Sequence, residues 1–163
     1  MELKERPRIG VMGASECPPR ILELAREVGY LIGRRGGLLV CGGQGGVMEA
    51  ACRGAKAAGG TTVGILPTSD RADANRYVDI AIPTGMGEAR NALVVRAADV
   101  LIAVAGEFGT LSEIALALRS GTPVVGLETW SLAPPEGGQA DIALARSPEE
   151  AVALAFRLAA GRP

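Results

Sequence analysis

The stretch Val-Leu-Ile-Ala-Val-Ala-Gly-Glu-Phe-Gly-Thr-Leu-Ser-Glu, at positions 100–113, decides the fold. Residues 100–105 are apolar throughout, as in a parallel strand that is covered on both faces. Gly106 and Gly109 allow a sharp turn and the close approach of a ligand to the backbone. Thr110 and Glu113 have the spacing of a capping box, which predicts that Thr110 caps a helix. The stretch therefore predicts a strand, a tight turn and a helix start.

A helix start of this kind has a chemical consequence. It presents unpaired backbone N–H groups and the positive end of the helix dipole, a combination that binds anions and phosphate above all. The stretch by itself leaves an alternative open, in which it is an ordinary capped turn and Glu113 only satisfies backbone amides.

The composition predicts one globular α/β domain. The chain has 163 residues, of which 48% are hydrophobic, and this is enough for one core. With 23 glycines and 3% aromatic residues, it lacks the rings of a platform for single-stranded nucleic acid. A net charge of −1 favours neither nucleic acid nor a membrane as a partner. No apolar run approaches about 18 residues, and the charged start lacks a signal segment, so a cytoplasmic protein is expected.

The residue types that are missing restrict the chemistry further. The chain has no histidine, which excludes Ser-His-Asp and Cys-His catalysis and histidine metal ligands. Lys4 lies in the charged start and Lys56 is expected to point to solvent, so a Schiff-base lysine for pyridoxal phosphate is not expected. Cys17, Cys41 and Cys52 lack Cys-x-x-Cys spacing and predict reduced thiols. We expect no metal or cofactor, and chemistry that uses arginine, carboxylates, hydroxyls and the backbone.

Strand and helix patterns alternate along the whole chain. Strands are expected at residues 8–13, 38–41, 61–66, 78–82, 100–105, 122–127 and 142–145. Helices are expected at 21–32, 47–58, from the glycine-rich segment 85–91 through 98, at 110–120, and at 147–160, where Ser147 is the cap. The polar segment 68–77 is expected to be an exposed loop. This alternation predicts a Rossmann-like, doubly wound, mostly parallel α/β sheet of about seven strands flanked by helices, in a single domain over residues 1–163.

Three glycine-rich turns follow predicted strands, at the sheet edge where such folds bind ligands. The turns contain Gly13 and Ser15, then Gly42, Gly43 and Gly46, and finally Gly106 and Gly109. Ser15 is expected to cap the next helix or to bind the ligand. Arg90 stands in the first turn of its predicted helix. A cation is unfavourable near this positive end of the helix dipole unless an anion or a carboxylate compensates its charge. The convergence of the turns favours a phosphate site.

These residues resemble the LOG (Lonely Guy) family over nearly the whole chain. The resemblance is carried by Gly42-Gly-x-x-Gly46-x-Met48, by Gly106-x-x-Gly-Thr110-x-x-Glu113, and by Arg90. The family includes phosphoribohydrolases, which cleave nucleoside 5′-monophosphates to free base and ribose 5-phosphate. The segments Met86-Gly-Glu-Ala-Arg-Asn91 and 111–118 are more similar to a branch of molybdenum-cofactor carrier proteins, which bind a pterin phosphate without turnover.

The resemblance implies roles for individual residues. Arg90 and Glu113 would be catalytic, with Glu113 facing the ribose and stabilising oxocarbenium-like charge while Arg90 pairs with it. The ligand-binding residues include those of the first glycine-rich turn and are Gly13, Ser15, Gly42, Gly43, Gly46, Met86, Gly106, Phe108, Gly109 and Thr110. Gly106, Gly109 and Thr110 would hold the 5′-phosphate.

Two departures from the family pattern keep the function open. Ala105 replaces a proline and Glu107 replaces a glycine, and a carboxylate repels a phosphate dianion unless it points away or meets a cation. The alternatives are a phosphoribohydrolase, a non-catalytic carrier or sensor of a pterin phosphate or nucleotide, and glycine turns that serve packing alone. The resemblance also implies a homodimer or homotetramer, with contacts from the helices after Gly46 and Arg90.

Overall fold

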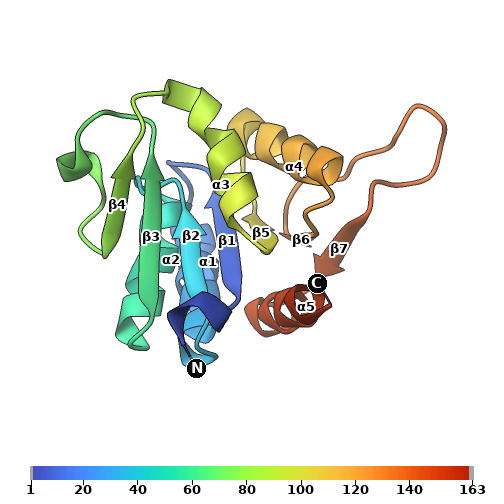
Figure 1. The fold of residues 1–163 in the computed structure, drawn as a ribbon. Coiled ribbons are helices and arrows are strands. Elements are labelled where there is room, and N and C mark those ends of the chain that lie inside the picture. Colours follow the sequence, from blue (N-terminus) through green and yellow to red (C-terminus); the bar gives the residue numbers. More distant parts are fainter. Residues whose placement is uncertain (1, 162–163) are drawn as a thin grey trace.

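The computed structural model describes residues 2–161 and contains a sheet in the order β4-β3-β2-β1-β5-β6-β7 (Figure 1). The strands are β1 (Arg8–Gly13), β2 (Leu38–Cys41), β3 (Thr61–Leu66), β4 (Ile80–Pro83), β5 (Val100–Val104), β6 (Val124–Leu127) and β7 (Ile142–Ala145). All six pairings are parallel, so the sheet that was expected to be mostly parallel is parallel throughout.

Helices cover both faces of this sheet. The α-helices are α1 (Pro19–Arg34), α2 (Val47–Ala57), α3 (Asn91–Ala97), α4 (Phe108–Ser120) and α5 (Pro148–Ala160). Short 3₁₀ helices are η1 (Leu3–Glu5), η2 (Arg71–Asp73) and η3 (Gly87–Arg90). Helices α1, α2 and α5 pack on one face, and α3 and α4 pack on the other (Figure 1). The predicted Rossmann-like α/β fold is confirmed.

Strand β5 shows why the apolar runs are continuous. All its residues are buried. Because successive side chains of a strand point to opposite faces, Ile102 enters the core under α1, α2 and α5, while Leu101 and Ala103 enter the core under α3 and α4. Burial on both faces therefore accounts for the unbroken apolar sequence of residues 100–105.

The order of the strands brings the glycine turns together. From β1 the chain builds outward through β2 and β3 to β4, and then returns to the other side of β1 with β5. The carboxyl ends of β2, β1 and β5 are therefore neighbours, and the switch point lies between β1 and β5. All three glycine-rich turns start at this edge, as predicted.

The capping box predicted at Thr110 and Glu113 is wrong. Helix α4 begins at Phe108, and the residue before it makes no capping hydrogen bond through its side chain. The reason is that Ala105 (φ 49°) and Gly106 (φ 105°) already reverse the chain, so the N-cap residue is Glu107, three residues before Thr110. Thr110 and Glu113 consequently lie inside the helix, where both are buried.

The other predicted caps have opposite outcomes. Ser15 does not cap α1, because that helix begins only at Pro19 and its N-cap residue is Pro18. Ser147 does cap α5, and its hydroxyl accepts a hydrogen bond of 3.2 Å from the backbone N–H of Glu150. The N-cap prediction is therefore confirmed for Ser147, which stands immediately before a proline and two glutamates, and it is wrong for Ser15.

Further differences concern boundaries and one lysine. The helix expected from the segment 85–91 through 98 is divided into η3 and α3, and the strands expected at 78–82 and 122–127 are shorter or shifted. Lys56 is exposed, as expected, but its ammonium group has partners. Its ammonium group donates to Asp79 Oδ2 (2.9 Å) and to the carbonyl of Gly60 (3.1 Å). Within residues 2–161, no helix is long and apolar enough to cross a membrane.

Helices α1 and α2 approach each other closely through glycines, which leads to a first prediction. Gly54→Ala is expected to lower the free energy of unfolding by about 2 kcal/mol, because its new methyl group would press on the Arg26 carbonyl oxygen of α1. The helix propensity of alanine, worth about 1 kcal/mol, offsets only part of this cost. Urea unfolding would measure it. Gly161→Ala is the control, since its nearest atoms begin at 3.8 Å; equal stability of the two variants would contradict the close packing.

Candidate functional site

A cavity of about 300 Å³ opens at the carboxyl ends of the central strands. It is bounded by the turns after β1 and β2, by η3 with the start of α3, and by the first turns of α4. Its lining residues are Val11, Met12, Gly13, Ala14, Ser15, Gly42, Gln44, Met48, Pro67, Glu88, Arg90, Asn91, Glu107, Gly109, Thr110 and Glu113. The cavity thus occupies the switch point of the sheet, where open α/β folds bind ligands.

Arg90 is the buried cation of this cavity, with 7% of its surface exposed. Its guanidinium contacts Asn91 Oδ1, and Nη2 donates to Gln44 Oε1 at 3.4 Å. Nε is buried and has no hydrogen-bond partner among the described residues. Gly42 makes room for the group, because a Cβ there would lie 2.6 Å from Nη2. An arginine held at a cavity by two amide side chains can donate further hydrogen bonds to a ligand, because its guanidinium carries five N–H groups.

Glu113 is a buried carboxyl with an altered pKa. Only 8% of its surface is exposed, and burial raises its pKa to about 7, although the charge of Arg90 acts in the opposite direction. We expected an ion pair between Arg90 and Glu113, and this prediction is wrong. Among the ion pairs within 4.0 Å in the described part of the chain, none joins these two side chains. The guanidinium is engaged by Asn91 and Gln44 instead. A carboxyl that titrates near neutrality can donate or accept a proton at physiological pH.

The turn after β2 is fixed by hydrogen bonds from Asn75, a residue that does not line the cavity. Gly43 adopts φ 74°, a conformation that favours glycine. Its carbonyl accepts a hydrogen bond of 2.8 Å from the backbone N–H of Asn75, and the carbonyl of Gln44 accepts one of 2.9 Å from the Asn75 side chain. The segment between β3 and β4 therefore fixes the turn that presents Gln44 to Arg90.

The turn before α4 supplies backbone donors. The first hydrogen bond of this helix is donated by Leu111 to the carbonyl of Glu107, so the three N–H groups before Leu111 have no partner within the helix. Gly109 lines the cavity, and the space that its side chain would occupy is open. Thr110 is 3% exposed and its side chain packs against Gly106. The geometry suits an anion at the start of α4.

The structure brings seven of the predicted site residues into this cavity and places five elsewhere. Those that line it are Gly13, Ser15, Gly42, Arg90, Gly109, Thr110 and Glu113. Those that do not are Gly43, Gly46, Met86, Gly106 and Phe108. Phe108 is 79% exposed and its ring packs on Trp130 with 5.8 Å between centroids. Gly43, Gly46 and Gly106 shape the turns, since a side chain at each would collide with its neighbours.

Sequence reasoning missed several lining residues. Gln44 is the only residue with a side chain in the turn of residues 42–46. A single polar side chain among four glycines could have identified it as a ligand-binding candidate. Glu88 and Asn91 lie in the segment already quoted for its resemblance to carrier proteins. Met48 belongs to the motif that carries the family resemblance, but no binding role was assigned to it. Glu107, noted as a departure from the family pattern, does line the cavity.

The cavity therefore combines one arginine with three carboxyls, those of Glu88, Glu107 and Glu113. With all three ionised, an anionic ligand would meet a net negative lining. Protonation of Glu113 near pH 7 reduces this repulsion. The start of α4 and the guanidinium of Arg90 are then the positive features available to a phosphate.

Comparison with known proteins places this site in context. The model of the SLOG cluster4 family matches residues 6–152. A cytokinin riboside 5′-monophosphate phosphoribohydrolase of Mycobacterium tuberculosis is 35% identical over 126 residues, which cover 72% of this chain and 67% of that protein.

Two solved structures are similar over almost their whole length. The molybdenum cofactor binding protein from Rippkaea orientalis is 40% identical with a TM-score of 0.86, covering 94% of this chain and 98% of that one. The Moco carrier protein from Chlamydomonas reinhardtii is 37% identical with a TM-score of 0.84, covering 97% and 100%.

Proposed function

The chain belongs to the SLOG cluster4 family, and on that premise we propose that it binds molybdenum cofactor, a phosphorylated pterin, and carries it without turnover. The observation that carries the proposal is the buried guanidinium of Arg90, which lines a cavity built on glycine turns. The similar proteins from Rippkaea orientalis and Chlamydomonas reinhardtii support the identity of the ligand.

The lining suggests how such a ligand would be held. Its phosphate would accept hydrogen bonds from the first backbone N–H groups of α4 and from the guanidinium of Arg90. Its ring would lie against Met48 and Pro67, with amide and carboxyl groups of Gln44, Asn91 and Glu88 available to its polar edge. These contacts require recognition only, which suits a carrier.

A second candidate function is the hydrolysis of nucleoside 5′-monophosphates. The observation that favours it is Glu113, because a carboxyl with a pKa of about 7 is suited to protonate a departing base. The phosphoribohydrolase of Mycobacterium tuberculosis supports the same reaction class. The missing ion pair counts against it, since no contact with Arg90 holds Glu113 in the ionised state that stabilises oxocarbenium-like charge.

One experiment separates the two functions. Anaerobic titration with molybdenum cofactor, followed by separation of bound from free ligand, is expected to give a stoichiometric complex that releases the cofactor chemically unchanged. Incubation with AMP, analysed by chromatography, is expected to release neither adenine nor ribose 5-phosphate. Release of both products by the wild type, lost in Glu113→Gln, would instead establish hydrolysis and overturn the carrier proposal.

A further inference from the structure

The turn between β5 and α4 has an unusual backbone conformation. Ala105 adopts φ 49°, in the left-handed region that residues with a side chain rarely occupy, and Gly106 follows with φ 105°. Glu107 is the N-cap residue of α4, but its side chain makes no capping hydrogen bond. A backbone conformation of this kind persists only where the surrounding structure stabilises it, so its support has to come from another part of the chain.

The loop after β6 supplies that support. Strand β6 is the neighbour of β5 on the side away from β1, and the carbonyl of its last residue, Leu127, accepts a hydrogen bond of 3.0 Å from the N–H of Ala105. The hydroxyl of Thr129 donates to the carbonyl of Ala105, and Nε1 of Trp130 donates to the carbonyl of Glu107 at 3.1 Å. Thr129 and Trp130 are half-buried and do not line the cavity of the candidate site. The turn is therefore held from the side that faces away from the ligand.

The two side chains also fix the directions of two backbone N–H groups. A trans peptide unit is planar, so its carbonyl and its N–H point in opposite directions. The hydrogen bond to the carbonyl of Ala105 therefore sets the direction of the Gly106 N–H, and the one to the carbonyl of Glu107 sets that of the Phe108 N–H. The N–H groups of residues 106–110 donate to no other backbone group within residues 2–161. These groups are the donors that the turn offers to an anion.

Ring packing holds Trp130 against the first turn of α4. Its ring lies on that of Phe108 at an interplanar angle of 40°. The carbonyl of Glu107 accepts the first hydrogen bond of the helix, from Leu111 (3.0 Å), as well as that from the indole. Trp130 thus contacts the helix start through the side chain of one residue and the backbone of the residue before it. Phe108 contributes to the site by supporting the indole from outside the cavity.

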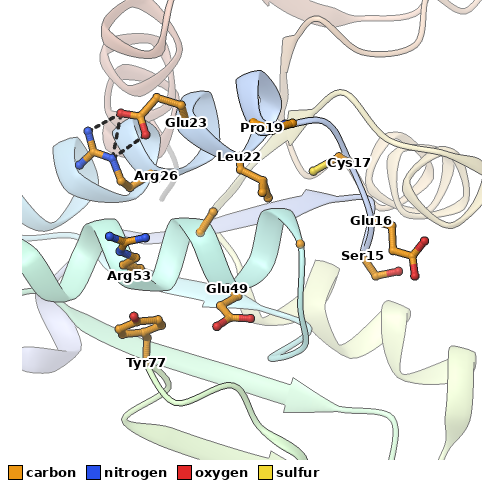
Figure 2. Close-up of a pocket in the computed structure, with 12 residues that line it drawn as sticks. Ser15, Glu16, Cys17, Pro19, Leu22, Glu23, Arg26, Glu49, Arg53 and Tyr77 are labelled. Atoms are coloured by element: carbon orange, nitrogen blue, oxygen red, sulfur yellow. Dashed lines mark hydrogen bonds and ion pairs between the residues drawn. The ribbon is translucent and has the colours of Figure 1, made fainter.

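A cavity of about 490 Å³ between the starts of α1 and α2 does not offer an alternative anion site (Figure 2). Its lining contains three carboxylates, those of Glu16, Glu23 and Glu49, and two arginines, Arg26 and Arg53. Arg26 is already paired with Glu23, with 2.6 Å between Nη2 and Oε1. Because this lining is net acidic, it repels an anion. The geometry of the turn before α4 is therefore what decides how well a phosphate is bound.

We propose that Thr129 and Trp130 are positioning residues of the anion site at the start of α4. They hold the N–H groups of Gly106 and Phe108 in place through the carbonyls of the same peptide units, without touching the ligand. A donor that is already aimed costs less to order when the phosphate binds. This inference rests on the proposed binding of a phosphorylated pterin, and it adds two residues outside the cavity on which the phosphate contacts depend.

The test uses a pair of probes that differ only in the phosphate. One is a stable 6-alkylpterin monophosphate, the other is the same pterin after treatment with a phosphatase, and equilibrium dialysis measures the binding of each. Thr129→Val and Trp130→Phe are each expected to weaken binding of the phosphorylated probe about tenfold, since each removes one hydrogen bond that aims a donor. Affinity for the dephosphorylated probe should not change. Thr129→Ser keeps the hydroxyl and should restore the affinity of the wild type.

The matched control is Thr84→Val. The hydroxyl of Thr84 also donates to a carbonyl at the end of a strand, that of Leu66 in β3, at 2.6 Å. The next residue in that peptide unit is Pro67, which has no N–H to aim. The control therefore loses the same kind of hydrogen bond and should bind both probes as the wild type does. Urea unfolding of every variant would show that the folded protein is being compared.

The outcomes separate this inference from the function on which it rests. Wild-type affinity for the phosphorylated probe in both Thr129→Val and Trp130→Phe would overturn the positioning role while the carrier function stands. An equal loss for the two probes would overturn it as well, because the loop would then support the whole cavity. Failure of the wild type to bind either molybdenum cofactor or the phosphorylated probe would overturn the carrier function itself. A loss confined to the phosphorylated probe and reversed in Thr129→Ser would establish the positioning role.

Discussion

Replacing Arg90 by methionine is expected to weaken the binding of molybdenum cofactor by about 100-fold, through loss of charge-assisted hydrogen bonds to the ligand phosphate. Methionine fills a similar length of cavity without a charge. The free energy of unfolding is expected to fall by no more than about 2 kcal/mol, because the loss of the contacts to Asn91 and Gln44 is opposed by the removal of a buried Nε that has no partner among the described residues. Anaerobic binding titrations, paired with urea unfolding of the same preparations, would measure both effects.

The matched control for this variant is Arg96→Met. Arg96 is exposed on α3, the helix that follows η3, and it does not line the cavity of Arg90. The variant loses the same charge from a nearby but exposed position, so a purely long-range electrostatic effect would weaken binding in both variants. Wild-type affinity in Arg90→Met would place the ligand elsewhere, and a large loss of stability would show that the guanidinium serves the core.

The fold was predictable because each element of the sheet carries a local signal. Apolar runs such as residues 100–105 mark strands that are buried on both faces, and the glycine turns mark their ends. Once the strands are parallel, their carboxyl ends must share one edge. Gly13, Gly42, Gly109 and Glu113 therefore converge on one cavity although they lie as far apart as 13 and 113 in sequence.

The details that escaped prediction depend on conformations or contacts that short patterns do not encode. The start of α4 shifted because Ala105 adopts φ 49°, which is uncommon for a residue with a side chain. The orientation of Arg90 depends on Gln44, 46 residues away, and on the space left by Gly42. These are tertiary effects, and only the assembled sheet edge reveals them.

Glu113→Gln is expected to raise the free energy of unfolding by up to about 3 kcal/mol at pH 8 and by very little near pH 4. Burial raises the pKa of Glu113 from 4.5 to about 7 in the folded protein. Between those values the folded state holds a proton that the unfolded state has released, so increasing pH lowers the stability of the wild type across this window. Above pH 7 the wild type bears the full cost of a buried carboxylate, which glutamine avoids. Urea unfolding from pH 4 to pH 8 would record the difference.

The same substitution tests why a destabilising group is retained. If Glu113 controls the charge of the cavity, wild-type affinity for the anionic cofactor should fall as pH rises through 7, and Glu113→Gln should remove that dependence. Glu136→Gln, an exposed carboxyl in the loop before β7, is the control and should change neither stability nor affinity. A Glu113→Gln protein no more stable than the wild type at pH 8 would mean that the carboxylate is solvated. A more stable variant with unaltered pH dependence of binding would separate the cost of Glu113 from cofactor recognition and assign it to proton transfer, as hydrolysis requires.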